Sequence, residues 1–438
     1  MDFSQLAHVF PDTAEVNAAG RLSIGGCDAA DLVAEYGTPL YVLCEDTLRN
    51  RCRSFTEAFK SLHSDTRVVY ASKAYIGPAL ARLMAEEGLG LDVVSGGELA
   101  VAMAAGVPPE GVYLHGNNKS AQELADALDA KIGRIVVDNL HEIDLLERLA
   151  AERGVAQPVL LRVTPGIDPH THAKTTTGIA DSKFGLNIGN GQAAEALRRT
   201  LDCPHLQLMG LHFHLGSPIF ELEPYVDAMG VVLEFAAQFR EEGLELRELS
   251  PGGGFAIPYL RHQRAPAPAD YAGAIVAALH EGCERHNLPL PSMTVEPGRS
   301  VVGPAGVALY TVGSIKEIPG VRTYAAVDGG MGDNIRPALY EARYEAVTAA
   351  RMNEAARVDY TIAGKFCESG DILVEQCALP ELSPGDLIAM PAAGAYSPSM
   401  ASNYNSNPRP PIVMVKDGAA RLIRRRETPA DLMVTDIW

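Results

Sequence analysis

The stretch Val68-Val69-Tyr70-Ala71-Ser72-Lys73 is an apolar run that ends in a lysine. An apolar run of this length predicts a buried strand. A lysine held at the end of such a strand is well placed to act as a nucleophile. The alternative is a lysine whose stem packs on apolar surface while its ammonium reaches water. The run alone leaves both interpretations open, and the rest of the chain has to decide between them.

Seven further apolar runs follow, and amphipathic helical patterns separate them. Eight units of a strand followed by a helix predict a closed parallel (β/α)8 barrel of the TIM type, with helices outside. An open doubly wound sheet is the weaker alternative, because no GxGxxG turn follows the first strand. The eight predicted strands are 68–73, 91–94, 112–115, 134–138, 158–163, 209–215, 247–250 and 293–296.

The pattern changes near residue 307, where β-rich runs and tight turns replace the alternation of strands and helices. This change predicts a second, mostly antiparallel β domain. The run 38–43 near the N-terminus is a strand that could join that domain. The predicted organisation is an N-terminal segment, 1–45, that joins the β domain, a barrel over 46–306, and a C-terminal β domain over 307–438.

Charge and composition narrow the class of protein. The chain has 438 residues, 47% of them hydrophobic, and a formal charge of −18. Such a charge argues against nucleic acid or an anionic membrane as the main partner. No apolar stretch is long enough to cross a bilayer, and the N-terminus lacks the pattern of a signal peptide. The seven cysteines are scattered without a CxxC pair. We therefore expect a cytoplasmic protein with reduced thiols.

Polar or glycine-rich residues stand at the end of every predicted barrel strand. In a (β/α)8 barrel the C-terminal strand ends converge on the face that carries the chemistry. Eight such ends are difficult to explain by structural needs alone. They are Lys73; Asp92 and Ser95; His115; Asp138; Arg162; His214 and Ser217; Gly252-Gly253-Gly254; and Glu296 with Gly298-Arg299.

The last two strand ends favour a phosphate site. A triple glycine lets backbone N–H groups approach an anion, and Arg299 can add a bidentate guanidinium. Glu296 would be a costly buried carboxylate unless it meets a cation or a proton donor. A lysine, a phosphate cradle and a carboxylate together match pyridoxal phosphate, whose ring nitrogen the carboxylate keeps protonated. His214 would then lie flat against the ring.

Metal hydrolysis is the competing chemistry. His212 and His214 would lie on one face of a strand, as would His170 and His172 if that segment is extended, and histidine pairs bind zinc. A hydrolytic site would also need carboxylate ligands nearby, and Glu296 is better explained by the pyridine nitrogen. We therefore expect no metal.

Motifs along nearly the whole chain resemble one known family, the fold-type III pyridoxal-phosphate decarboxylases with their alanine-racemase-like barrel. Within that family the chain is most similar to the branch that acts on meso-diaminopimelate. The motifs run from Tyr36-Gly37-Thr38-Pro39-Leu40-Tyr41 through Tyr70-Ala71-Ser72-Lys73-Ala74, Asp92-Val93-Val94-Ser95-Gly96-Gly97-Glu98, His115-Gly116-Asn117-Asn118-Lys119, Ser182-Lys183-Phe184-Gly185, His212-Phe213-His214-Leu215-Gly216-Ser217 and Glu296-Pro297-Gly298-Arg299 to Gly332-Asp333-Asn334-Ile335-Arg336-Pro337-Ala338-Leu339-Tyr340, Cys367-Glu368-Ser369-Gly370-Asp371 and Gly394-Ala395-Tyr396.

The resemblance implies a role for each matching position. Lys73 is implied to carry the cofactor, and Cys367 to be the proton donor, which in this family comes from the partner subunit of a homodimer. The implied cofactor contacts are Asp92, His214, Ser217, Gly253, Gly254, Glu296, Gly298, Arg299 and Tyr396. The implied substrate contacts are Arg299, Arg336, Tyr340, Glu368 and Tyr396. The chain departs from the family pattern at Tyr75-Ile76 and at Ser397-Pro398, neither of which bears a chemical role.

The residue chemistry also predicts the reaction. A carboxylate at the ring nitrogen, Glu296, favours a full electron sink and hence decarboxylation, whereas racemases of the family place an arginine there. Arg299 and Arg336 beside Glu368 suit a distal group with both a carboxylate and an ammonium. We expect decarboxylation of meso-diaminopimelate at its D-centre to give L-lysine and CO2. The alternatives are a related decarboxylase of a basic amino acid, a metal-dependent barrel hydrolase, and a catalytically silent cofactor-binding regulator.

Overall fold

The computed structural model describes residues 3–168, 176–179 and 181–437. The chain divides into two compact units, which are described separately. The barrel unit comprises Arg51–Ala256 and Ala265–Gly298, and the β unit comprises Met1–Asn50, Ile257–Arg264 and Arg299–Trp438. This division into compact units does not test the predicted domain bounds at 45/46 and 306/307, which remain a prediction.

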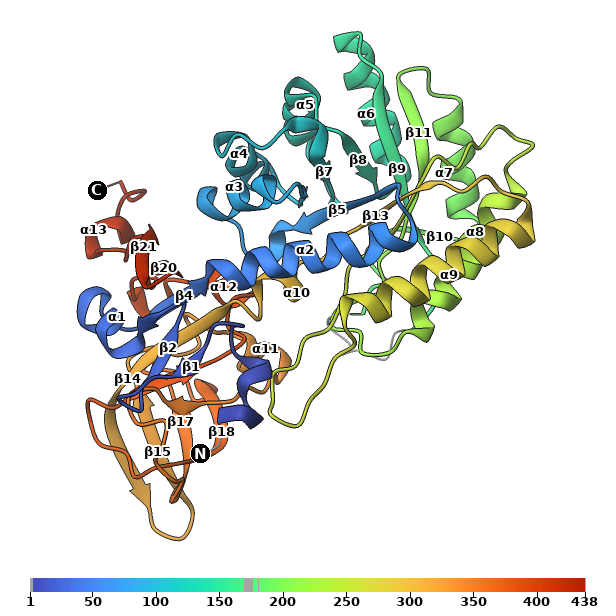
Figure 1. Ribbon diagram of the computed structural model, residues 1–438. Coiled ribbons are helices and arrows are strands. Elements are labelled where there is room, and N and C mark those ends of the chain that lie inside the picture. The colour runs from blue at the N-terminus through green and yellow to red at the C-terminus, as the bar shows by residue number, and fades with distance from the viewer. Residues whose placement is uncertain (1–2, 169–175, 180, 438) are drawn as a thin grey trace. The chain divides into compact units, whose positions relative to one another are not determined.

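The barrel unit contains a closed ring of eight parallel strands, as predicted (Figure 1). The last strand pairs with the first, in the register Met293 with Thr66, and this pairing closes the ring. The strands in order around the barrel are β5 (Thr66–Ala71), β6 (Gly90–Val93), β7 (Val112–Leu114), β8 (Arg134–Val137), β9 (Gln157–Thr164), β11 (Leu206–His212), β12 (Glu248–Gly252) and β13 (Ser292–Val295).

Helices follow the barrel strands, and polar residues between strand and helix cap several of them. Ser95, Ser120 and Asn139 each accept a hydrogen bond from the backbone of a residue three positions later, which satisfies a free N–H of the first turn. The helices of this part are the segment of α2 (Glu45–Leu62) from Arg51 onward, α3 (Pro78–Glu86), α4 (Gly96–Ala104), α5 (Ala121–Ala130), α6 (Leu140–Arg153), α7 (Gln192–Leu201), α8 (Glu223–Gln238) and α9 (Pro268–His286).

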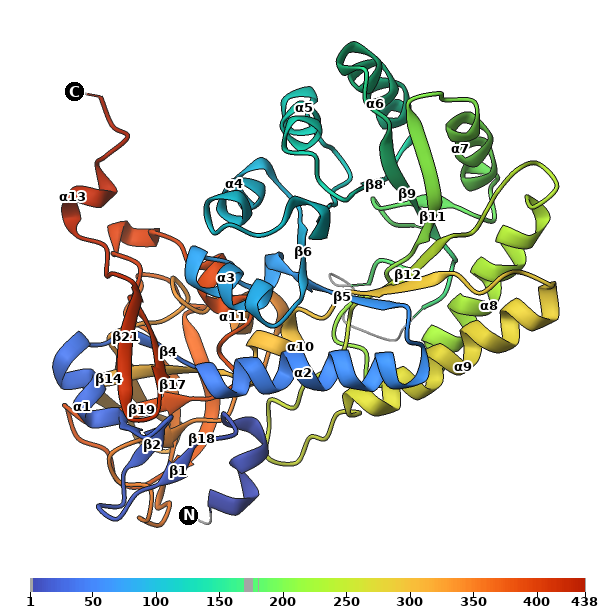
Figure 2. The same cartoon turned by 45° about the horizontal axis from the view of Figure 1, so that its top comes forward.

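The β unit is built on a mostly antiparallel sheet, which confirms the prediction (Figure 2). Two of its pairings, β4 with β20 and β15 with β17, are parallel. Its strands are β4 (Leu40–Cys44), β14 (Gly306–Ile318), β15 (Arg322–Val327), β16 (Val347–Thr348), β17 (Val358–Ala363), β18 (Ile372–Leu379), β19 (Leu387–Met390), β20 (Ile412–Lys416) and β21 (Ala419–Arg424).

The predicted N-terminal strand joins this sheet. All five residues of β4 are buried, and the strand lies between β14 and β20. Apolar residues of the first 50 positions complete the same core, with Leu22, Ile24 and Leu32 packed among the buried residues of the sheet. The short strands β1 (Glu15–Val16), β2 (Leu22–Ile24) and β3 (Cys27–Asp28) form a separate small sheet.

The remaining elements of the β unit are short helices. They are α1 (Ala29–Tyr36), α10 (Arg299–Val302), α11 (Arg336–Tyr340), α12 (Ser397–Met400) and α13 (Pro429–Leu432). Within the part of the chain that the structure describes, no helix combines the length and the apolar character that a membrane span requires.

Candidate active site

Lys73 lies two residues beyond the first barrel strand. The predicted strand 68–73 is displaced, because β5 ends at Ala71 and Ser72–Ala74 form a 3-10 turn. The side chain of Lys73 is exposed, whereas Ser72 and Ala74 are buried. The turn therefore fixes the backbone on both sides of Lys73 and leaves the amine free to project. Its positive charge helps to lower the pKa of His214, after the larger effect of burial.

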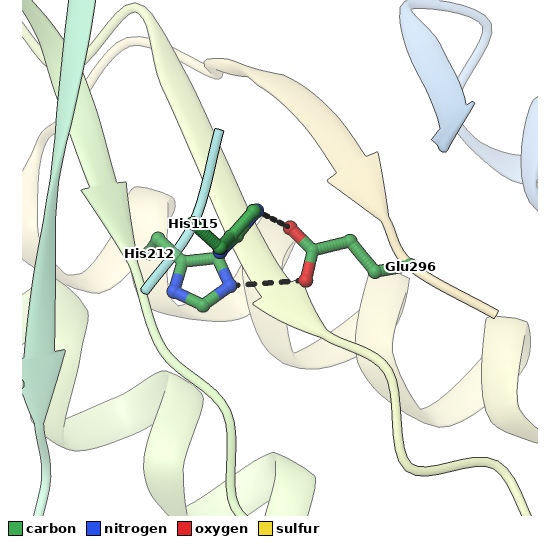
Figure 3. Close-up of side chains that lie close together, drawn as sticks. All are labelled: His115, His212 and Glu296. Carbon is green, nitrogen blue, oxygen red and sulfur yellow. Dashed lines mark hydrogen bonds and ion pairs between the residues drawn. The ribbon is translucent and has the colours of Figure 1, made fainter. Parts of the chain in front are cut away.

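Glu296 follows β13 and is buried, with polar groups on both oxygens (Figure 3). Nε2 of His212 lies 3.1 Å from Oε2, and the hydroxyl of Ser250 donates to Oε1 over 3.1 Å. Nε2 of His115 lies 3.4 Å from Oε1. Burial by itself would raise the pKa of Glu296, but the two histidines hold it well below its usual range. The carboxylate is therefore ionised at neutral pH.

Asp92, the last residue but one of β6, extends this group of side chains. Its Oδ1 lies 3.8 Å from Nε2 of His115 and, like that nitrogen, is buried without a hydrogen-bond partner among the described residues. Burial raises the pKa of Asp92, although His115 opposes the change. Buried polar atoms without partners are rare in proteins, and they mark this end of the barrel as a place built for a ligand.

His214 lies two residues beyond the end of β11, not within the sixth barrel strand as predicted. Its Nδ1 accepts a hydrogen bond of 3.3 Å from the N–H of Gly253. A side chain on Gly252 would collide with the ring, so the glycine allows this close approach. Burial lowers the pKa of His214 well below the usual value, and the charge of Lys73 adds to this effect. His214 is therefore a neutral ring held by backbone.

The glycines after β12 and β13 leave no room for side chains. A Cβ atom on Gly253 would lie 2.1 Å from the carbonyl oxygen of Glu296, and one on Gly254 2.4 Å from that of Gly216. A Cβ on Gly298 would meet Ala71 at 2.9 Å. The N–H groups of Gly254 and Gly298 make no hydrogen bond to the residues that the structure describes. These donors suit the oxygens of a phosphate.

Ser217 lies beside this cradle. The N–H of Ile219 donates to the carbonyl of Gly254, which brings the segment after β11 against the glycines. Ser217 is half-buried there. A strand-end lysine, an ionised carboxylate, a neutral histidine and a glycine cradle in one barrel unit are the groups that pyridoxal phosphate requires. The residues of the barrel unit therefore fit that cofactor.

His212 and His214 do not lie on one face of a strand, as the competing metal-hydrolase interpretation would require. His212 is the last residue of β11 and faces Glu296, whereas His214 lies beyond the strand and bonds to Gly253. His170 and His172 lie outside the described residues. Among the described residues, the side chains whose spacing could suit a metal are His115, His212 and Glu296, with ligand atoms within 4.8 Å of one another.

The β unit holds a second group of polar side chains, which we call the arginine–tyrosine cluster: Tyr259, Arg299, Arg336, Tyr344 and Tyr396. Arg299 donates from Nη1 to the hydroxyl of Tyr259 over 2.7 Å, and its guanidinium lies 4.8 Å from the ring of Tyr396. Arg336 donates to the hydroxyl of Tyr344, and its guanidinium lies 4.9 Å from the ring of Tyr259.

The cluster places two guanidinium groups beside tyrosine hydroxyls and rings. Arg336 is buried, and no carboxylate among the described residues forms an ion pair with it. Burial would raise the pKa of Tyr259, but Arg299 and Arg336 beside it lower that pKa. Two cations held by tyrosines form a site that attracts an anion. Tyr340 lies one helical turn after Arg336, at the end of α11, and is half-buried.

Cys367 and Glu368 are both exposed on a loop whose base is firmly held. The carboxylate of Asp371 accepts hydrogen bonds from the N–H groups of Met331 and Phe366, over 2.6 and 2.8 Å. The N–H of Cys367 donates to Asn405, and Phe366 stacks on Tyr404. The loop therefore presents a thiol and a carboxylate to solvent from a fixed position in the β unit.

Sequence reasoning gave no site role to His115, Tyr259 or Tyr344. The sequence pattern places His115 only at a polar strand end, although a histidine directly after an apolar run is a usable signal of a site residue. Tyr259 and Tyr344 are aromatic residues in irregular segments, and no local pattern distinguishes them from core residues.

Comparison with known proteins identifies the class first. Residues 45–303 match the model of a protein family described as "Pyridoxal-dependent decarboxylase, pyridoxal binding domain". The chain is 49% identical in sequence to diaminopimelate decarboxylase of Bacillus subtilis, in an alignment that covers 97% of each protein. The solved structure of diaminopimelate decarboxylase from M. jannaschii in complex with L-lysine is 36% identical, with a TM-score of 0.91 and coverage of 98% of each chain.

A more distant likeness is to the lysine/ornithine decarboxylase of Vibrio vulnificus, solved with putrescine. It is 25% identical, with a TM-score of 0.75 over 89% of this chain and 97% of that one. The chain therefore belongs to the diaminopimelate decarboxylase family of the pyridoxal-dependent decarboxylases.

Proposed function

We propose that the protein is a carboxy-lyase that uses pyridoxal 5'-phosphate to decarboxylate meso-diaminopimelate at its D-centre, giving L-lysine and CO2. This is the last step of lysine biosynthesis. The observation that carries the choice of substrate is Arg336, a buried guanidinium bonded only to tyrosine among the described residues. A substrate with a distal carboxylate would supply the missing anion. The family membership supports the same substrate.

Residues of the barrel would hold the cofactor. Lys73 would bind it covalently through its amine, and Gly253, Gly254, Gly298 and Ser217 would surround its phosphate together with Arg299 and Tyr396. Asp92 and His214 would contact its ring, and Glu296 would face the ring nitrogen. When bound, the cofactor supplies an electron sink for the charge left on the α-carbon as CO2 departs. An ionised Glu296 would keep the ring nitrogen protonated.

Residues of the β unit would bind the substrate and deliver the proton. Arg336 and Arg299 would bind the distal carboxylate, with Tyr340 and Tyr396 beside it, and Glu368 would bind the distal ammonium. The thiol of Cys367 would donate a proton to the α-carbon after the C–C bond to the carboxylate has broken. A fixed proton donor on one side of the α-carbon accounts for a single stereochemical outcome.

We further infer a homodimer in which each active site takes Cys367 and Glu368 from the partner subunit. The support is their exposure: both side chains project from a rigid loop into solvent. An exposed thiol in a fixed position suits a surface that a second copy covers. A cytoplasmic location agrees with seven cysteines that form no disulfide among the described residues.

The decisive experiment is an ultraviolet–visible spectrum of the purified protein, followed by turnover of three substrates. We expect a visible band from the lysine-bound cofactor, and turnover of meso-diaminopimelate far above that of L-lysine and L-ornithine. Faster turnover of ornithine would replace the proposal by a decarboxylase of basic amino acids. A colourless protein whose activity a chelator abolishes would favour the metal-dependent hydrolase that His115, His212 and Glu296 could form.

A further inference from the structure

Both oxygens of the Glu296 carboxylate face an imidazole, and the two imidazoles come from different strands (Figure 3). His212 is the last residue of β11, and His115 directly follows β7. The two rings meet edge to face, with centroids 4.9 Å apart and an angle of 68° between their planes. Neither ring stacks on the carboxylate, and each offers Nε2 to a different oxygen.

The proton on His212 can be assigned from its partners. An ionised carboxylate only accepts hydrogen bonds, so Nε2 of His212 carries the proton that Glu296 accepts. Nδ1 of His212 is buried and has no hydrogen-bond partner among the described residues. A second proton there would be an unpaired buried donor, which is costly. His212 is therefore neutral, in agreement with a pKa that burial lowers to about 4.

His115 holds Glu296 less tightly. Its Nε2 lies 3.4 Å from Oε1 of Glu296 and 3.8 Å from Oδ1 of Asp92, and it has no hydrogen bond in good geometry. Among the described residues, the other charged or titratable groups that act on these side chains are Lys73, Glu98, Arg162 and His214. Arg162 is itself buried, with Nε 3.9 Å from Asp138. His115 thus lies near both carboxylates, whereas the only carboxylate near His212 among the described residues is Glu296.

We propose that His115 and His212 are positioning residues that keep the Glu296 carboxylate ionised and aimed at the ring nitrogen of the cofactor, with His212 as the stronger of the two. The inference rests on the proposed function, because it assigns Glu296 to that nitrogen. A carboxylate in a dry site would otherwise take up a proton and lose the charge that the ring nitrogen needs. The two imidazoles beside the carboxylate prevent this, and the neutral His212 does so without adding positive charge beside the ring.

The test compares His212→Leu, which removes the donor, with His212→Gln, whose side-chain amide can replace the Nε2 donor. In His212→Leu the pKa of Glu296 rises, so the carboxylate is protonated as pH falls. We expect the acid limb of the pH profile of kcat to move to higher pH by about one to two units. At neutral pH, kcat should fall about 10- to 100-fold. The absorbance of the bound cofactor should become pH-dependent over the same range.

The matched variants separate positioning from folding. His212→Gln should restore most of the spectrum and the pH profile, and His115→Leu should lower kcat only about 2- to 10-fold because its contact is looser. His280→Leu is the control, since His280 lies in the barrel unit and contacts His63 rather than Glu296. It should leave the pH dependence of the cofactor band unchanged.

Two outcomes would contradict the proposed role of the histidines, and a third would contradict the proposed function on which it rests. If His212→Leu binds cofactor with the spectrum and acid limb of the parent protein, the histidines do not act through Glu296. If His212→Leu does not fold, His212→Asn replaces it, because asparagine has the same amide with a shorter reach. Equal pH profiles for His212→Asn and His212→Gln would then contradict the proposal. A parent protein without any cofactor band would refute the proposed function itself.

Discussion

The acid–imidazole group of the barrel unit and the arginine–tyrosine cluster of the β unit solve opposite electrostatic problems. In the barrel, Glu296 is a buried anion whose partners are two histidines and a serine of the same chain. In the β unit, Arg336 is a buried cation whose partners are tyrosines. The first group pairs its buried charge within the barrel unit and can tune a bound ring, whereas Arg336 has no carboxylate partner among the described residues and can recognise a ligand that brings one.

Lys73→Ala should have the largest effect, because it removes the covalent attachment of the cofactor on the barrel side. We expect loss of the visible absorbance band and no measurable turnover. The arginine–tyrosine cluster should be unaffected, so the thermal unfolding of the apoprotein should match that of parent protein stripped of cofactor. A yellow, fully active Lys73→Ala protein would show that another amine carries the cofactor.

The second prediction tests whether Lys73 of the barrel unit and Cys367 of the β unit act across a subunit boundary. Cys367→Ala alone should bind cofactor normally and be nearly inactive, because the proton donor is missing. Mixing it with inactive Lys73→Ala chains under conditions of verified subunit exchange should restore partial activity, since one site of each mixed dimer has both residues. The control is the same mixture kept under conditions in which subunits do not exchange. No recovery after exchange would argue that each chain supplies its own thiol.

Arg336→Ala should separate recognition from cofactor chemistry. Losing one partner of a buried charged pair costs about 2–5 kcal/mol, so kcat/KM for meso-diaminopimelate should fall about 30- to 5000-fold, mostly through KM. L-Lysine and L-ornithine lack the distal carboxylate and should lose little. The cofactor spectrum should stay that of the parent protein. A comparable loss for all three substrates would mean that Arg336 supports the fold instead.

A pH prediction extends the contrast to two buried carboxylates. Glu296 faces histidines that lower its pKa, but burial raises the pKa of Asp333 in the β unit to about 7, with one backbone N–H of Gly330 as its hydrogen-bond donor. Between pH 4 and 7 the folded state binds this proton more tightly than the unfolded state, so stability falls as pH rises. The total change is at most about 4 kcal/mol.

Asp333→Asn should remove that slope. The amide oxygen can still accept from Gly330, but it has no proton to lose, so the variant should be more stable than the parent protein at pH 8 and similar at pH 4. Denaturant unfolding at the two pH values measures the difference. Parallel pH profiles for the two proteins would show that other groups dominate.

Sequence patterns were sufficient for the barrel because each of its strands is a local apolar run, and neighbouring strands in sequence pair in space. They also located Lys73 and Glu296, since strand ends converge in any such barrel. The exact ends of the strands were harder to predict from the sequence. β5 ends at Ala71 and β11 at His212, because the polar residues that follow them enter turns. Side-chain direction within the barrel depends on strand register, which no local run encodes.

The arginine–tyrosine cluster could not have been derived from local patterns. Tyr259 follows the triple glycine of the barrel but belongs to the β unit, with Arg299 and Arg336 as its neighbours. Contacts among segments that far apart arise only when the chain has folded. The resemblance to a family supplied Arg299, Arg336 and Tyr396, and the structure added Tyr259 and Tyr344, which contact the two arginines.

The position of β4 has a consequence for how the chain is made. This wholly apolar strand leaves the ribosome early, yet both of its neighbours, β14 and β20, are synthesised long afterwards. Until residues 412–416 exist, at least one edge of β4 is open and available to the wrong partner. The barrel between them needs one long-range pairing, that of β13 with β5, and its other pairings join successive barrel strands, so it can fold meanwhile. Newly made chains, rather than mature ones, are thus the most aggregation-prone form of this protein.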